Sequence, residues 1–415
     1  MDELKNKVVK ARASLNSMIS LSSEEKNQAL LKIADALESK SSYILAENKK
    51  DIDKALSSGI SDGLLDRLTL SEERIKAMAQ GVRQITQLED PIGEVIEAFT
   101  RPNGLYIEKV RVPLGVIGII YEARPNVTVD CCALAIKTGN TVLLRGSANA
   151  LNSNKALIRV ITEALSITKV PEAAVALIES PDKSLVASML KLKDYIDVII
   201  PRGGAGLINY VVENSLIPVL ETGVGNCHIY IDEEASYPMA ESIVLNGKTQ
   251  RIGVCNATES LLVHKKWAEK HLSSLCSELR NSGVELRGCP LAIEYFKDMK
   301  PAEEADWGTE YLDMILSVKV VEDVKEAIDH INTYGTKHTE AIITENQDNA
   351  RLFMQLVDAS AVNHNASTRF TDGFEYGFGA EIGISTQKLH ARGPMGLKEL
   401  TSYKYLVHGQ GQIRK

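Results

Sequence analysis

The stretch NGKTQRIGVCNATE, residues 246–259, holds the side chains best suited to chemistry. Cys255 stands among small and polar residues, and Lys248 and Arg251 precede it closely. Positive neighbours lower a thiol's pKa and favour the nucleophilic thiolate, whereas a structural cysteine usually sits among Val, Leu and Ile. The pattern therefore favours an exposed, reactive cysteine. The competing interpretation is a small hydrophobe on a loop, which is the commoner fate of cysteines.

The composition is that of a globular chain with no basic or membrane-directed character. Its 415 residues are 44% hydrophobic and 25% charged, which is ordinary for two or three domains. The net charge of −8 argues against a nucleic-acid partner, and neither a long apolar run nor a signal-peptide core is present. We therefore expect a cytoplasmic protein with no membrane partner. We expect no metal site, because CxxC spacing is absent, and free thiols at Cys131, Cys132, Cys227, Cys255, Cys276 and Cys289.

Helices must dominate the first 90 residues, where apolar positions recur at three and four spacings. The clearest segments are 8–19, 29–37 and 75–85, and Ser22 and Ser71 are suited to cap helix starts. Residues 105–112 then alternate apolar and charged side chains, which predicts a half-exposed strand. A strand of this kind is a candidate for pairing with another subunit.

Two blocks of alternating strands and helices follow. The first predicts buried strands at 116–120, 141–144, 175–177 and 198–200. The second begins near 217 and predicts strands at 217–220, 228–231, 260–264, 312–320, 340–344 and 360–363, with a last strand at 402–407. Strands that alternate with helices in this way predict doubly wound α/β domains.

Loops that follow such strands are the expected sites for a cofactor. Gly203 and Gly204 lie in PRGGAGL, where their backbone N–H groups could approach a phosphate at a helix start. A tight structural turn explains these glycines equally well. Arg145 and Ser147 follow the 141–144 strand, where a ribose or phosphate would bind, but ordinary surface residues are also found there.

From about Val112 to the C-terminus the motifs resemble the aldehyde dehydrogenase superfamily. The segment PLGVIGII, followed by Asn126 and by AIKTGNTVLLRGSANA, is similar to the family's segment around its oxyanion-hole asparagine. LETGVGN resembles the family's glutamate motif, with Glu221 placed 34 positions before Cys255. Thr309-Glu310-Tyr311 resembles the motif whose glutamate holds a nicotinamide ribose.

This resemblance implies two doubly wound α/β domains plus a small oligomerisation strand element. Residues 1–222 would form the NADPH-binding domain, with 99–113 inserted as an oligomerisation strand. Residues 223–365 would form the catalytic domain that carries Cys255. Residues 366–415 would return as a loop to the cofactor domain and end in an oligomerisation strand.

Four blocks narrow the resemblance to one branch of the superfamily. YEARPN, GKTQRIGVCNATESLLVH, PRGGAGLI and ARGPMGLKELTSYKY are similar to the branch that reduces L-glutamyl 5-phosphate to L-glutamate 5-semialdehyde in proline biosynthesis. The branch implies NADPH, a small-molecule substrate, a homo-oligomer and a functional coupling to glutamate 5-kinase. The alternatives are an oxidising or CoA-acylating semialdehyde dehydrogenase, and a catalytically idle binding protein on the same scaffold.

The resemblance also implies roles for single residues. Cys255 would attack the acyl carbon, and Asn126 with the Cys255 backbone N–H would hold the oxyanion. Lys248 and Arg251 are close enough in sequence to stabilise the departing phosphate. Because the reduction needs no water, Glu221 either orients groups near the cofactor or closes a turn.

Further charged and polar residues bear on the choice of cofactor and on substrate binding. NAD-preferring relatives place an acid shortly after position 145, whereas this chain has Ser147 there and Arg145 can pair with a 2′-phosphate, which favours NADPH. Arg124 and Arg369 are candidates for the substrate's α-carboxylate, and Glu122 or Asp372 for its α-amine. Surface ion pairs would explain the same residues.

Overall fold

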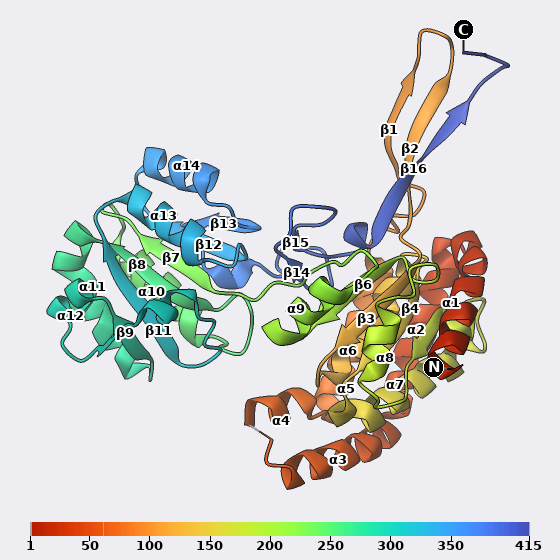
Figure 1. Cartoon of the computed structure of the whole chain (residues 1–415), viewed down its shortest axis with the longest axis horizontal. Coiled ribbons are helices and arrows are strands. Elements are labelled where there is room, and N and C mark those ends of the chain that lie inside the picture. The colour runs from red at the N-terminus through yellow and green to blue at the C-terminus, as the bar shows by residue number, and fades with distance from the viewer. Residues whose placement is uncertain (1, 61, 415) are drawn as a thin grey trace. The chain divides into compact units, whose positions relative to one another are not determined.

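The computed structural model describes residues 2–60 and 62–414, which divide into two compact units. Unit 1 holds the chain up to Glu221, together with Gly377–Gly383 and the segment from Met395 onward. Unit 2 holds Thr222–Tyr376 and Ile384–Pro394. Figure 1 labels the elements of both units. Each unit contains a parallel sheet with helices on both faces, so the predicted doubly wound α/β class is confirmed.

The main sheet of unit 1 is parallel, with its strands in the order β5-β4-β3-β6. Every residue of β3 and β4 is buried, as expected for strands that are covered on both faces. The four strands are β3 (Val116–Tyr121), β4 (Thr141–Gly146), β5 (Val175–Leu177) and β6 (Val198–Arg202).

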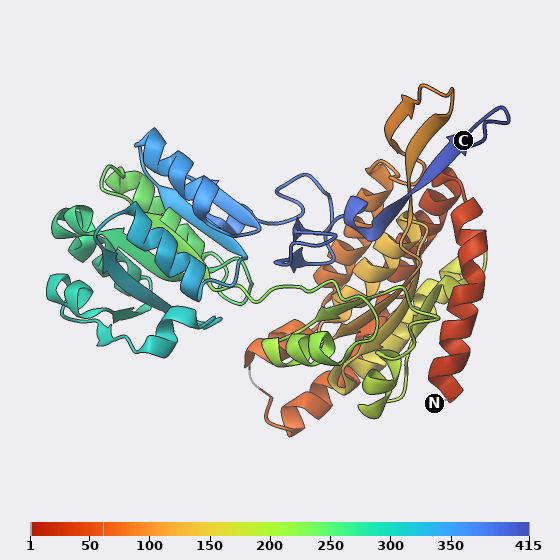
Figure 2. The ribbon, with the colours of Figure 1, turned by 45° about the horizontal axis from the view of Figure 1, so that its top comes forward.

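Helices cover both faces of this sheet. One core joins the sheet to α1, which Figure 2 shows at the edge of the unit, and to α8 and α9. On the other face α6 and α7 contact the strands, and α2 and α5 pack against α6. The helices are α1 (Asp2–Ser20), α2 (Ser23–Ser39), α3 (Ser41–Ser57), α4 (Asp62–Leu68), α5 (Glu72–Gln87), α6 (Pro125–Lys137), α7 (Leu151–Leu165), α8 (Ser184–Met189) and α9 (Ala205–Asn214).

Sequence signals explain where two of these helices begin. Ser22 accepts a hydrogen bond from the N–H of Glu25, whose side chain accepts one from the Ser22 N–H in return, which completes a capping box before α2. Ser71 caps α5 through the N–H of Arg74. Both caps were predicted from the sequence.

A second, antiparallel sheet of three strands completes unit 1. Its order is β1-β2-β16, so the C-terminal strand pairs with a hairpin from the first third of the chain. The strands are β1 (Val95–Thr100), β2 (Tyr106–Pro113) and β16 (Thr401–His408). Large apolar side chains stand exposed on it, namely Val95, Ile96, Phe99, Tyr106, Tyr403, Tyr405 and Val407.

Unit 2 is built on a parallel sheet whose strands lie in the order β10-β9-β11-β8-β7-β12-β13. The strands are β7 (Cys227–Ile231), β8 (Thr258–His264), β9 (Glu285–Gly288), β10 (Lys300–Pro301), β11 (Ile315–Val321), β12 (Thr339–Ile343) and β13 (Ala361–His364).

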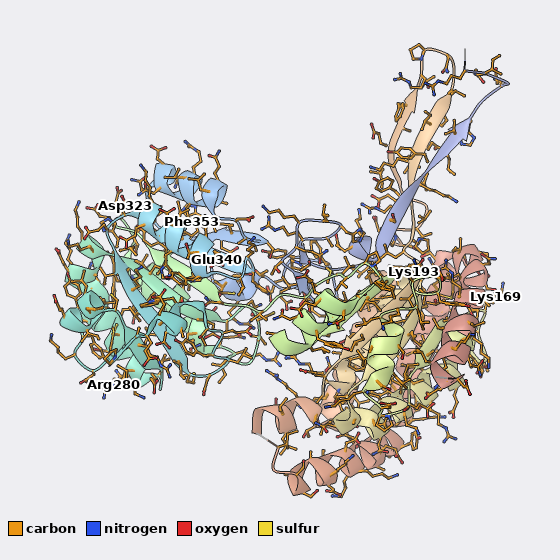
Figure 3. The ribbon with its side chains drawn as sticks, viewed as in Figure 1. Lys169, Lys193, Arg280, Asp323, Glu340 and Phe353 are labelled. Atoms are coloured by element: carbon orange, nitrogen blue, oxygen red, sulfur yellow. The ribbon has the colours of Figure 1, made fainter. Side chains whose placement is uncertain are left out.

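The two faces of this sheet have separate cores. Side chains alternate along β7, so Ile229 and Ile231 join one core and Tyr230 joins the other. Phe353, labelled in Figure 3, stacks on Tyr230 with ring centroids 6.2 Å apart. The first core packs α10 (Tyr237–Thr249), α11 (Lys265–Asn281) and α12 (Pro290–Tyr295), and the second packs α13 (Val324–Tyr334) and α14 (Gln347–Leu356).

One predicted strand is wrong. Residues 217–220 form only a single bridge, between Val219 and Ile199 of β6. Pro218 has no N–H to donate, which limits further pairing. The segment therefore belongs beside the sheet of unit 1 and does not open the sheet of unit 2.

The chain from 366 onward alternates between the units before it ends in β16. A short antiparallel pair, β14 (Ile384–Ser385) with β15 (Gly393–Pro394), belongs to unit 2. Among the described residues, no helix is both long and apolar enough to cross a membrane.

Candidate active site

Cys255 lies on the turn that joins α10 to β8 and is half-buried. The backbone of Gly225 passes directly beneath this turn, since a Cβ at Gly225 would lie 1.5 Å from the Cys255 carbonyl oxygen. Only a glycine permits that approach. The LETGVGN motif therefore supports the nucleophile through its last glycine.

Cys227 supports the same turn from β7. Its thiol donates to the Cys255 carbonyl oxygen at 3.2 Å. Burial raises the pKa of Cys227 well above the usual thiol range, so the sulfur keeps its proton and remains a donor. The two cysteines therefore differ: Cys227 is buried and protonated, whereas Cys255 is half-buried.

The segment NASTRFTDG, residues 365–373, packs against the residue after the nucleophile. The Thr368 hydroxyl donates to the Asn256 carbonyl at 2.7 Å, and the Asn256 side-chain amide donates to the Thr371 carbonyl at 2.9 Å. These contacts bring Arg369, far away in sequence, next to the Cys255 turn.

Arg369 and Arg251 form a local concentration of positive charge. Arg369 Nε donates to the Gln250 side-chain oxygen at 2.8 Å. Burial and the charge of Arg251 both lower the pKa of Arg369, while Asp372 and Cys255 oppose that shift. Two guanidinium groups that repel each other beside a nucleophilic turn form an arrangement that an anion would stabilise. Arg251 is exposed, so its guanidinium can reach a bound anion.

Lys248 does not lie with these two arginines, which corrects our expectation that it stabilises the departing phosphate. Its side chain is 0% exposed and its ammonium lies 2.5 Å from Glu259 Oε2. Burial lowers the pKa of Lys248, and the attraction of Glu259 opposes that shift. A lysine enclosed in an ion pair cannot reach a departing phosphate without breaking the pair.

Glu310 is tied to the nucleophile's surroundings. Its Oε1 accepts the N–H of Gly225 at 2.8 Å. The resemblance gives this glutamate a role at a nicotinamide ribose, and the observed contact orients its carboxylate from within unit 2. Glu221 is half-buried in the extended segment before β7 and is the last residue of unit 1 before the chain continues into unit 2.

A buried polar pair lies next to Cys227 in β7. The backbone N–H of His228 and its Nδ1 lie 2.7 Å and 3.0 Å from Glu340 Oε2. Glu340, labelled in Figure 3, stands on β12, and its carboxyl pKa is raised by burial. The pair joins two neighbouring strands, which gives His228 a structural role.

Asn126 belongs to unit 1, at the second position of α6. Its side-chain amide is exposed and donates to Asp130 Oδ2 at 3.2 Å. Burial raises the pKa of Asp130 to about 6, with the Asn126 bond and the charge of Arg202 opposing the shift. One amide N–H is thereby directed to Asp130, which leaves the other for a ligand.

Arg145 and Ser147 offer polar atoms at the carboxyl end of β4. Arg145 Nη2 donates to the Pro181 carbonyl at 3.2 Å, and the side chain is 6% exposed. In the described part of the chain, Arg145 Nε and Ser147 Oγ are buried without a hydrogen-bond partner. Buried donors without partners are uncommon and fit a cofactor group at this strand end.

Gly203 and Gly204 are explained by a side chain. The N–H of Gly204 donates to Glu122 Oε2 at 3.0 Å, and a Cβ at Gly203 would lie 2.7 Å from Glu122 Cδ. A carboxylate at the start of α9 takes the position that a phosphate would need. The structure therefore favours the tight-turn interpretation of PRGGAGL, and it assigns Glu122 to this turn. Arg124 occupies the N-cap position of α6, where its side chain makes no capping hydrogen bond, and it is half-buried.

Four supporting residues were not predicted: Gly225, Cys227, Asp130 and Glu259. The four-residue spacing of Asn126 and Asp130 on a helix is a signal that could have indicated their contact. The remaining three depend on the pairing of strands that are distant in sequence.

The model of the aldehyde dehydrogenase family matches residues 1–286, which is more than half of the chain. The chain therefore belongs to the aldehyde dehydrogenase family. Membership supports a nicotinamide cofactor and a small-molecule substrate, and members of the family are typically oligomeric.

Within this family, relatives that are 54–57% identical over the whole chain are named γ-glutamyl phosphate reductase. The chain is 56% identical over 414 residues to γ-glutamyl phosphate reductase 1 of Bacillus licheniformis, and the match covers 100% of both chains. The crystal structure of γ-glutamyl phosphate reductase from Thermotoga maritima matches with a TM-score of 0.97, 52% identity and 100% coverage of both chains. The Saccharomyces cerevisiae structure of the same name matches at 32% identity and a TM-score of 0.56, covering 100% of this chain and 99% of the yeast chain.

Proposed function

We propose that this chain reduces L-glutamyl 5-phosphate to L-glutamate 5-semialdehyde and phosphate, a step of proline biosynthesis. The identity of 56% over the whole length to a γ-glutamyl phosphate reductase supports this activity. The observation that carries the mechanism is the half-buried Cys255 on a turn that lies next to Arg251 and Arg369.

Cys255 performs the first step as a nucleophile. Its thiolate forms a bond to the acyl carbon, and the acyl–phosphate bond breaks, which leaves a thioester and free phosphate. The side-chain amide of Asn126 and the Cys255 backbone N–H stabilise the oxyanion, and one such donor contributes about two to three orders of magnitude in rate.

Arg251 and Arg369 bind the anionic ends of the substrate. We assign Arg251 to the departing phosphate, because its guanidinium is exposed beside the turn. Arg369 is the candidate for the α-carboxylate, because Gln250 fixes its guanidinium at Nε. Arg124 remains a second candidate for that carboxylate.

NADPH is the proposed cofactor, and when bound it would supply the hydride for reduction of the thioester. Arg145 and Ser147 would hold its ribose and 2′-phosphate, since both carry buried polar atoms that lack a partner among the described residues. Glu310 would hold the nicotinamide ribose, with its carboxylate oriented by the N–H of Gly225. Glu221 is proposed to orient groups near that ribose.

The reverse reaction tests the function. Oxidation of glutamate 5-semialdehyde, followed as NADPH formation, is expected to require phosphate and to disappear in Cys255→Ala. Equal activity without phosphate would indicate an oxidising dehydrogenase, and activity that requires CoA in place of phosphate would indicate an acylating one. Faster turnover with NAD than with NADP would overturn the cofactor assignment.

A further inference from the structure

The cysteine turn is closed at its base by a buried pair of opposite charges. Lys248 stands in the last turn of α10 and Glu259 is the second residue of β8, so the pair joins the two ends of the loop that carries Cys255. Their side chains are each 0% exposed, and Lys248 Nζ lies 2.5 Å from Glu259 Oε2.

The second oxygen of Glu259 reaches a different loop. Glu259 Oε1 accepts the N–H of Leu312 at 3.1 Å. Leu312 has a φ of 53°, a left-handed conformation that a bulky residue adopts only when its surroundings enforce it. The accepted N–H is one such constraint, and it lies two residues after Glu310.

Glu310 closes the connection back to the nucleophile. Its carboxylate accepts the N–H of Gly225, and the backbone of Gly225 lies against the Cys255 carbonyl. Contacts therefore run from Glu259 through the 310–312 loop to Gly225 and the Cys255 turn, all within unit 2.

Stability alone does not account for such a pair. Removing two charges from water costs more free energy than their attraction commonly returns, and apolar residues of similar volume often stabilise as well or better. A carboxylate that binds an ammonium with one oxygen and a backbone N–H with the other can instead fix the relative position of two loops.

We propose that Lys248 and Glu259 are positioning residues that fix the position of the Cys255 turn relative to the Glu310 loop. Both side chains are 0% exposed, so neither is placed to touch substrate or cofactor. The inference rests on the proposed function for the role of Glu310, but the geometry of the turn can be tested without any substrate.

Two double variants separate positioning from charge. Lys248→Met/Glu259→Gln and Lys248→Met/Glu259→Leu both remove the buried charges, but only Gln retains an oxygen that can accept the N–H of Leu312. In semialdehyde oxidation, we expect the Gln variant to keep its kcat within about threefold of the native value, and the Leu variant to lose at least about tenfold with a raised KM for NADP⁺. The KM for phosphate should change in neither variant, because Lys248 does not meet that anion.

Lys26→Met is the matched control for a broken buried pair. Lys26 is 2% exposed and pairs with Asp90 in unit 1, far along the chain from the cysteine turn. We expect it to lower the melting temperature and to leave kcat and both KM values of the folded protein unchanged.

The rate at which iodoacetamide alkylates Cys255, followed by peptide mass spectrometry without substrate, gives a readout that is independent of the proposed activity. We expect faster alkylation in the Leu variant than in the Gln variant, because a loosened turn exposes the half-buried sulfur. Equal alkylation rates and equal kcat in the two variants would overturn the inference, as would a raised KM for phosphate. Should the Leu variant not fold, a Gln variant with native alkylation but a raised KM for phosphate would also overturn it. If the alkylation rates differ as expected but the native protein shows no phosphate-dependent turnover, the result would instead count against the proposed function.

Discussion

Charge is distributed unevenly around Cys255. Arg251 and Arg369 lie beside the turn, while the ammonium of Lys248 is enclosed beneath it with Glu259. The sequence alone placed both Lys248 and Arg251 close to a reactive thiol. It could not show that the last turn of α10 directs Lys248 toward β8.

Replacing Arg251 should weaken phosphate binding specifically. In semialdehyde oxidation, Arg251→Ala is expected to raise the KM for phosphate about 10- to 100-fold, because a hydrogen bond to a charged group contributes about 1.5–3 kcal/mol. Arg159→Ala is the control, since Arg159 lies on the surface of α7 in an ion pair with Glu163. Similar phosphate KM values in the two variants would contradict the assignment of Arg251.

Asp130 should give the protein a pH-dependent stability. Its pKa is raised to about 6 in the folded state, so the free energy of unfolding decreases as the pH rises from about 4 through 6. Asp130→Asn lacks this loss of stability. The melting temperature of the variant minus that of the native protein should therefore increase from pH 5 to pH 7.5. Asp348→Asn, at a carboxylate with 90% exposure, should show no such trend. A constant difference between the native protein and Asp130→Asn over this range would count against the burial of Asp130.

At the scale of elements, a glycine and two strands define the place of the nucleophile. Gly225 leads into β7, Cys255 precedes β8, and the two strands pair in parallel from Cys227 and Thr258 onward. The pairing brings the Gly225 backbone under the Cys255 carbonyl, which explains why a motif 34 positions earlier supports the turn.

Adding one methyl group at this contact should displace the turn. In Gly225→Ala the new carbon would meet the Cys255 carbonyl oxygen at 1.5 Å, so the backbone must move. We expect kcat to fall about 10²-fold, the loss that a misplacement of about 1 Å can cause. Gly206→Ala is the control, because a Cβ there meets nothing within 4 Å. Native kcat in Gly225→Ala would show that the turn adapts and that its position does not limit the rate.

Elements with continuous apolar runs were predicted well from the sequence, because burial on both faces leaves few alternatives to a parallel strand. Helix α3 lies in the region predicted to be helical, but it was not among the clearest segments, for a physical reason. Two of its four buried positions are polar, Asn48 and Asp51, so its apolar periodicity is interrupted. Both are satisfied by distant partners, since Asn48 and Asp51 each bond to Ser153 on α7. Such contacts leave no local signal.

At the scale of the whole molecule, the three-stranded sheet of unit 1 leaves β16 at an edge. Its outer backbone groups and the exposed Tyr403, Tyr405 and Val407 form an open strand of a kind that soluble proteins usually cover. This supports the predicted homo-oligomer.

A charge on β16 should change the molecular mass in solution. The native protein is expected at a multiple of the 45.4 kDa chain in size-exclusion chromatography with light scattering. Tyr405→Glu should shift the mass toward a smaller species, because a carboxylate opposes burial in an interface. Ile167→Glu, at an isolated side chain with 74% exposure, should leave the mass unchanged. An unaltered mass for Tyr405→Glu would exclude β16 from the interface.

The central claim is that Cys255 carries the acyl group between phosphate and the cofactor. It is tested most directly by a burst experiment, in which the protein is mixed with glutamate 5-semialdehyde and NADP⁺ without phosphate. If a covalent intermediate accumulates until phosphate releases it, we expect a burst of about one NADPH per active chain and then turnover once phosphate is added. Peptide mapping should place the acyl group on Cys255. Sustained turnover without phosphate, or an acyl group on another residue, would contradict the account.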